Sequence, residues 1–126
     1  MEKALRYELI KAIPELKDQI YPTNAPEGVF KPYLVYVRIN TDKTKTLEGY
    51  TDEQALSYMF SIMTTKYGDM KKIRDKVEKL LLSLPLKNIG SDGSIYVEDL
   101  SINNIDEAWE SQLQVNRGII DFTIYY

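Results

Sequence analysis

One strongly amphipathic stretch, residues 69–84, constrains this chain more than any other segment. Plotted at about 100° per residue, its apolar side chains gather in about 100° of arc, and charged side chains fill most of the rest. Gly68 and Asp69 form a typical helix start, with Asp69 as the N-cap, and Pro85 a typical stop. The sequence therefore predicts a helix with one narrow buried face, made by Met70, Ile73, Val77, Leu80, Leu81 and Leu84.

A second, shorter helix is predicted over residues 2–13. Leu5, Leu9 and Ile13 recur there at i, i+4 and i+8, which gives one apolar stripe. Pro14 ends this helix or opens one further turn. A short strand is expected next, over residues 19–21.

Other segments have the patterns of strands. Residues 33–39 are apolar on most of both faces, as in a covered strand. Residues 53–66 fit a helix or a strand, and their aromatic and β-branched content favours the strand. A strand is predicted over residues 95–102, a turn at "NNIDEA", and a long final strand over residues 109–126. The apolar phase of this last strand changes around Asn116-Arg117-Gly118, which predicts a β-bulge.

These elements follow one another as helix, strand, irregular arm, strand, loop, strand, helix and two further strands. Strands outnumber helices and do not alternate regularly with them. The order predicts an α+β fold, in which a mixed, mainly antiparallel sheet of four to five strands carries two α-helices on one face. The length suits one domain over residues 1–126.

Two irregular segments flank the first long strand. Pro26 and Pro32 remove backbone donors, so residues 22–32 are expected to form an ordered arm outside the sheet. This arm either docks on a neighbouring chain at low entropic cost or covers its own sheet. Residues 40–50 are polar and turn-prone, which predicts an exposed loop or a projecting hairpin.

Composition excludes several classes of function. The chain has no cysteine and no histidine, so it can form neither a disulfide, a zinc finger nor a histidine-based catalytic triad. Its net charge of −3 argues against a general nucleic-acid binder. No apolar run approaches the roughly 20 residues that span a bilayer, so no membrane association is expected.

Acidic residues that could serve catalysis occur as adjacent pairs: Asp52-Glu53, Glu98-Asp99 and Asp106-Glu107. Neighbouring side chains on a strand point apart, so these pairs do not make a shared site. We therefore predict no catalytic, cofactor-binding or metal-binding residues, no cofactor and no enzyme activity. A small carboxylate-dependent hydrolase is the alternative, and it would need a cleft with two converging acids.

The order of the segments carries a resemblance. An opening helix leads to "IYPTNAP" and "KPYLVYVRI", and a polar loop closes with "LEGY" before the strand "ALSYMFSI". A helix ending "VEKLLLSLP" and a final "NRGIIDFTIYY" follow. From about Ala4 to Tyr126 this order resembles the tail-completion or tail-terminator family of long-tailed bacteriophages and prophages. The loop departs from the family pattern, since it reads "TDKTKT" where an arginine-bearing stretch is expected.

The resemblance implies a structural virion protein that forms a ring, usually of about six copies, on the end of the tail tube. Such a ring stops tube growth and presents a surface to the head. The implied partners are further copies of the chain, the tail tube protein and a head-completion or connector protein, with DNA only passing through the lumen. The implied location is the head–tail interface of the virion, and the host cytoplasm during assembly.

Candidate interface residues come from the arm, the polar loop and the charged side of the long helix, where Leu82 is the one apolar residue. They are Tyr21, Phe30, Lys43, Lys45, Glu48, Tyr50 and Leu82. Two alternatives to the terminator stay open: another head–tail joining or tail-tube component, and a small module that binds a partner by strand addition along its last strand.

Overall fold

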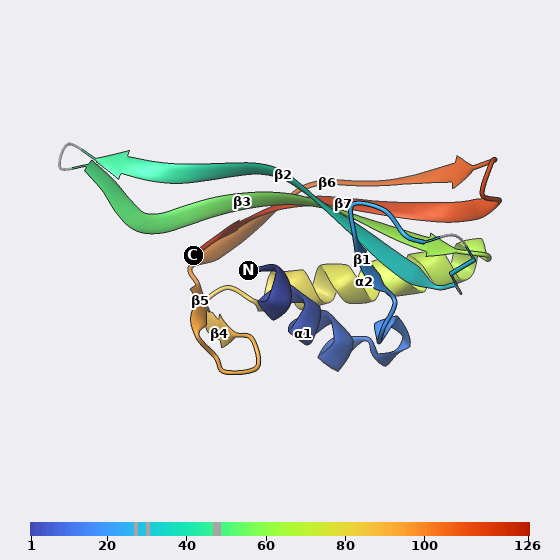
Figure 1. The fold of residues 1–126 in the computed structure, drawn as a ribbon, viewed down its shortest axis with the longest axis horizontal. Helices are drawn as coiled ribbons and strands as arrows, with labels where there is room; N and C mark the ends of the chain where they lie inside the picture. Colours follow the sequence, from blue (N-terminus) through green and yellow to red (C-terminus); the bar gives the residue numbers. More distant parts are fainter. Residues whose placement is uncertain (27, 30, 47–48) are drawn as a thin grey trace.

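The computed structural model describes residues 1–26, 28–29, 31–46 and 49–126, apart from the side chains of residues 40–46 and 49–53. Its helices lie beneath one face of a long twisted sheet (Figure 1). The elements are α1 (Glu2–Ala12), the 3₁₀ turn η1 (Pro14–Leu16), β1 (Ile20–Pro22), β2 (Tyr33–Thr46), β3 (Gly49–Thr64), α2 (Tyr67–Ser83), β4 (Lys87–Ile89), β5 (Ile95–Val97), β6 (Asp99–Glu110) and β7 (Val115–Tyr125).

The large sheet has the strand order β1-β2-β3-β7-β6. Short β1 runs parallel to β2, and every other neighbouring pair is antiparallel. Strands β4 and β5 form a separate small hairpin beside α1. The predicted α+β fold, with a mixed and mainly antiparallel sheet of five strands and two helices on one face, is confirmed.

The main core lies between the helices and the sheet. From β3 and β7, Tyr58, Phe60 and Phe122 meet at its centre, and the Phe60 and Phe122 rings lie edge to face with centroids 4.8 Å apart. The predicted stripe of α2 faces this cluster, since Met70, Ile73, Val77 and Leu81 are buried. The apolar face of α2, which repeats every 3.6 residues, thus packs against the alternate apolar side chains of β3 in one layer.

Helix α2 begins two residues before the predicted start. Lys66 is the N-cap, so the prediction that Asp69 caps the helix is wrong. Asp69 lies instead in the first turn, where its negative charge favours the positive end of the helix dipole. The Thr64 hydroxyl, at the end of β3, donates a hydrogen bond to the carbonyl of Lys66. The connection between β3 and α2 is therefore only two residues long, and Asp69 already lies inside the helix.

The chain does not turn at "NNIDEA", contrary to the prediction. Strand β6 continues to Glu110, and the turn occupies residues 111–114, with Gln114 in the left-handed region at φ 52°. The ladder with β7 shifts register between Ile102 and Asn104. Asn103 and Asn104 therefore lie at a bulge within an exposed edge strand. The sequence predicted a turn there because asparagines are also typical of turns.

The predicted bulge at residues 116–118 is also wrong. Residues 116–125 of β7 pair with β3 in continuous register. The change of apolar phase arises because Trp109 and Leu113 belong to β6 and the turn, while Val115 is buried on the other face of the sheet. Gly118 has a different role, since a Cβ there would lie 2.7 Å from Met70 Sδ. The glycine lets α2 approach the sheet closely.

Replacing Gly118 by valine is expected to lower the free energy of unfolding by about 1–3 kcal/mol, because the new side chain must displace Met70 and Arg74. The same substitution at Gly68, where a Cβ meets no atom within 4 Å, is the matched control. We expect the control to stay within about 0.5 kcal/mol of the native chain in urea denaturation. Equal losses in the two variants would contradict the close-approach explanation.

The hydroxyl of Tyr58 is buried, and it has no hydrogen-bond partner in the described part of the chain. Burial raises the pKa of Tyr58 far above its usual range, and the negative charge of nearby Glu2 raises it further. The folded chain therefore keeps Tyr58 neutral at a pH where the unfolded chain ionises it.

Above pH 10, the ordinary value for tyrosine, this difference should cost stability. We expect the free energy of unfolding of the native chain to fall more steeply than that of Tyr58→Phe, by up to about 1.4 kcal/mol per pH unit. The phenylalanine variant should also match or exceed the native stability at pH 8, because it removes an unpaired hydroxyl. Urea titrations between pH 8 and pH 11 test this, and parallel curves would refute it.

Candidate functional site

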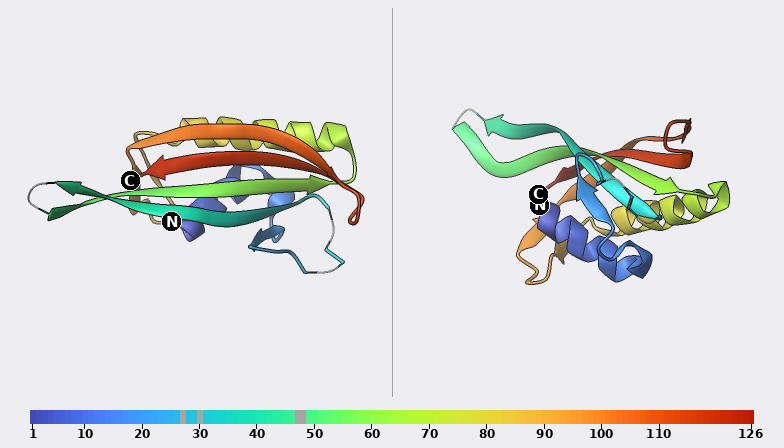
Figure 2. Two further views of the ribbon diagram at one scale, coloured as in Figure 1. Left: turned by 90° about the horizontal axis from the view of Figure 1, so that it is seen from above. Right: turned by 45° about the vertical axis from the view of Figure 1, so that its right-hand side comes forward.

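Strands β2 and β3 continue beyond the body of the molecule as a long hairpin (Figures 1 and 2). Of the two alternatives predicted for this segment, the projecting hairpin is correct for the described residues 40–46 and 49–50. Lys43 and Lys45 lie on β2, where they pair with Gln54 and Tyr50 of β3. The side chains of Lys43, Lys45 and Tyr50 and the whole of Glu48 lie outside what the structure describes.

The arm packs against its own sheet. Ala25 and Val29 lie over a cluster on the face opposite the helices, formed by Tyr33, Val35, Met63 and Val115. A groove of about 470 Å³ runs between this end of the arm and the sheet. At its floor, Arg117 donates from Nε to Ser61 Oγ at 3.0 Å and pairs with Glu110 at 3.1 Å. The arm therefore covers its own sheet, the second of the two predicted alternatives.

Tyr21, the candidate at the start of the arm, has its contacts within the chain. Its ring meets that of Tyr33 edge to face at 6.3 Å, and its hydroxyl lies 3.1 Å from Gln19 Oε1 and 3.2 Å from the Asp18 carbonyl. Phe30 lies outside the described residues. The contribution of the arm to contacts with other chains stays a prediction.

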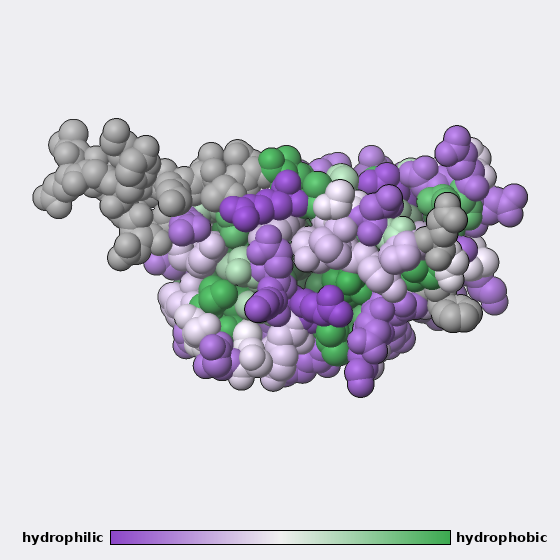
Figure 3. All heavy atoms as spheres, in the orientation of Figure 1, coloured by the Kyte–Doolittle hydropathy of each residue, from purple (hydrophilic) through white to green (hydrophobic). Residues whose placement is uncertain are grey.

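The remaining candidate, Leu82, is 55% exposed near the end of α2. Leu86, four residues later, is also exposed. The hairpin and the arm occupy opposite ends of the long axis (Figure 2). The candidates do not converge on one surface, and Figure 3 shows apolar side chains in separate patches among polar ones over the face it displays.

The sequence did not single out the edge formed by β6. From Asn103 to Trp109 this strand is exposed on both faces, and Trp109 is 58% exposed. The misleading signal was "NNIDEAWE", whose mixture of acids and apolar residues does not alternate as a half-buried strand does. Its two exposed apolar side chains, Ile105 and Trp109, were the available clue.

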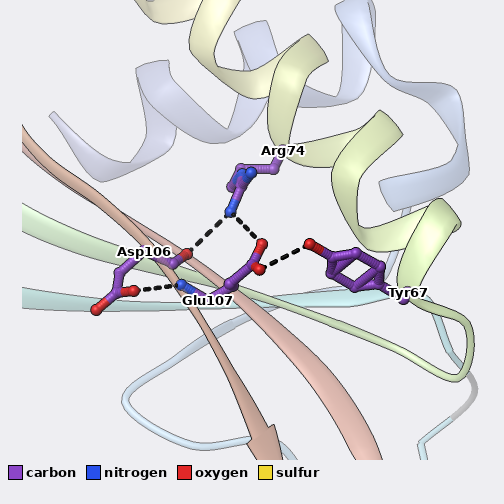
Figure 4. A network of polar contacts seen from close by, with 4 residues as sticks. All are labelled: Tyr67, Arg74, Asp106 and Glu107. Carbon is purple, nitrogen blue, oxygen red and sulfur yellow. Dashed lines mark hydrogen bonds and ion pairs between the residues drawn. The ribbon is translucent and has the colours of Figure 1, made fainter.

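A polar network holds β6 to α2 (Figure 4). Arg74 Nη1 lies 3.3 Å from Glu107 Oε2 and donates to the carbonyl of Asp106 at 3.1 Å, while the Tyr67 hydroxyl donates to Glu107 Oε1 at 2.7 Å. This hydrogen bond to Glu107 raises the pKa of Tyr67. The carboxylates of Asp106 and Glu107 point apart, as strand alternation predicts. The network therefore fixes the inner face of β6 and leaves its edge uncovered.

The described residues contain no cluster of three or more histidine, cysteine, aspartate or glutamate side chains able to hold a metal. Over the same part of the chain, no helix is long and apolar enough to cross a membrane.

Comparison with known proteins identifies the family. The family model described as "Tail completion protein gp17" matches residues 7–126. A solved chain from "Virion of native gene transfer agent (GTA) particle" has the same fold, with a TM-score of 0.71 at 11% identity over 99% of this chain and 92% of that one. No curated protein matches. The resemblance drawn from the order of the segments is confirmed, and this chain belongs to the tail completion protein gp17 family as a structural component of a phage-like virion tail.

Proposed function

We propose that the protein forms a ring of about six copies on the end of the tail tube, stops tube growth and joins the tail to the head. The observation that carries this proposal is the family match over residues 7–126. The role is structural and needs neither catalysis nor a cofactor. Its partners are other copies of the chain, the tail tube protein and a head-completion or connector protein.

Ring closure needs a heterologous contact, in which two different surfaces of each subunit meet. The large sheet supports this requirement because its two edges are unlike. One edge is the long strand β6, and the other is formed by short β1 and the part of β2 beyond it. A subunit with one copy of each edge can repeat around a ring without a twofold axis.

Joining two structures also needs contact surfaces at both ends of the ring. The β2–β3 hairpin extends at one end of the long axis, and the turn between β6 and β7 lies at the other (Figure 1). We assign the end of this hairpin, where Tyr50 pairs with Lys45, to contacts with a neighbouring virion protein; Glu48, the remaining candidate of this segment, lies outside the described residues. DNA would only pass through the lumen.

The decisive measurement is the effect of the purified protein on tails made without it. We expect tails from a strain that lacks this coding sequence to be abnormally long or headless, and added protein to cap them in negative-stain images. Light scattering should show either a ring of about six 14.6 kDa chains or a monomer that assembles on the tail. Long tubes formed by the protein alone would assign it to the tube instead. Failure to bind tails would refute the proposal.

Leu82 offers a separate test of the interface assignments. Leu82→Glu is expected to leave the free energy of unfolding within about 0.5 kcal/mol, because the side chain is largely exposed. If Leu82 contacts another virion protein, the yield of joined particles should fall by roughly tenfold or more. Ser83→Glu, at the neighbouring exposed position, is the matched control. Equal yields from both variants would remove Leu82 from the interface.

A further inference from the structure

The outer edge of β6 is uncovered beyond the bulge at residues 102–104. Its only strand neighbour in the described part of the chain is β7, and residues 104–110 pair with β7 without interruption. Over residues 103–109 both faces are exposed. The strand contains no lysine and no proline, the residues that commonly block pairing with another chain. This edge is therefore open to strand addition.

The opposite edge of the sheet is also open over part of its length. Strand β1 pairs with β2 only at residues 34–36. Residues 39–46 continue as a strand beside β3, and no described strand lies on their other side. At about 3.3 Å per residue this segment spans roughly 26 Å, and its ladder with β3 shifts register between Arg38 and Asn40 and between Lys43 and Lys45. Ile39, at its start, is 57% exposed.

The two edges differ in charge. Strand β6 carries four acidic residues and no basic one: Asp99, Asp106, Glu107 and Glu110. Glu107 and Glu110 pair with Arg74 and Arg117. Asp99 and Asp106 form no ion pair within the described residues. The open part of β2 carries Lys43 and Lys45 against the single acid Asp42. Opposite charges placed across neighbouring strands stabilise their pairing.

Strand direction favours the same arrangement. Because β2, β3, β7 and β6 are successively antiparallel, β6 runs opposite to β2. When copies are related by rotation about an axis to which the strands are tilted, the β6 of one copy meets the β2 of the next in antiparallel orientation and displaced along it. Strand β1 blocks the first part of β2, so the neighbour is staggered toward the hairpin. A closed sheet requires such a stagger.

We propose that a second copy of this chain adds the edge of its β6 to residues 39–46 of β2, with acidic side chains of β6 opposite Lys43 and Lys45. The inference rests on the proposed ring and names the surfaces that close it. Each subunit gives one edge and receives the other, so the sheets of neighbouring subunits become continuous.

Charge reversal tests this pairing. One variant carries Lys43→Glu and Lys45→Glu, and a second carries Asp106→Lys. Each alone places like charges across every interface, and we expect ring yield on tails to fall at least tenfold. An equimolar mixture should recover near-native yield, because rings that alternate the two variants have complementary charges at every interface. A variant with all three changes should also assemble.

The matched control reverses two exposed lysines of α2, Lys72→Glu and Lys79→Glu, and should assemble normally. Loss of assembly in this control, or normal assembly of either edge variant, would overturn the pairing while leaving the ring itself intact. No recovery in the mixture from two folded variants would also overturn it. If the native protein fails to cap tails, the proposed function fails instead, so the two failures are distinguishable.

Cysteine cross-linking gives an independent measurement, since the chain has no cysteine of its own. Lys43→Cys is combined in turn with cysteine at each position from 104 to 110, and the proteins assembled on tails are oxidised. Strand pairing predicts a ladder of cross-linked chains only at alternate positions, because successive side chains point to opposite faces. Cross-linking at no position, or equally at all of them, would overturn strand pairing.

Discussion

The arrangement of this molecule depends on the close approach of α2 to the sheet at Gly118. With no side chain there, Met70 rests against the strand, and Arg74, one turn later, passes over the same point. Gly118 pairs with Glu107 in the ladder between β7 and β6, so Arg74 reaches Glu107 directly. One missing side chain thus permits the helix packing, and the packing in turn positions the polar network that holds the distal half of β6. A bulkier residue would disturb the core and the edge strand together.

The packing of helices and arm decides which surfaces of the sheet are covered and which stay exposed. The helices cover one face of the sheet, and the arm covers one end of the other face through Ala25 and Val29. The stiff, proline-containing segment therefore shields a satellite apolar cluster, and this role explains why it precedes a core strand. The surfaces left for other proteins are the projecting hairpin and the two sheet edges. All three are extended backbone held by a rigid layer, which suits a part that must keep its shape within a larger assembly.

Much of the fold could be predicted from the sequence because burial imposes periodicity. The stripe of α2 and the apolar alternation of β3 both face the core, so both elements were identified. The same reasoning failed at β6, where Asn103 to Trp109 are exposed on both faces and no periodicity is imposed. This error caused a second one. Because Trp109 was assigned to the last strand, the pattern implied that the apolar side chains of that strand change face, and a bulge was predicted at residues 116–118. For the interaction surfaces, the composition of residues 40–50 predicts an exposed loop or a projecting hairpin, whereas the β6 edge depends on strand order that the sequence does not state.

The charges of the two edges also explain how an open edge strand can avoid pairing with the same edge of other copies. Strand β6 could pair with β6 of another copy about a twofold axis, but over residues 104–110 this would bring Asp106, Glu107 and Glu110 of the two copies together. Like charges across strands disfavour that dimer, and pairing β2 edges would likewise oppose Lys43 and Lys45. Only the unlike edges attract. In the proposed ring, acidic β6 residues would therefore serve in place of blocking lysines or prolines: they would disfavour isologous pairing and leave the heterologous contact that a ring requires.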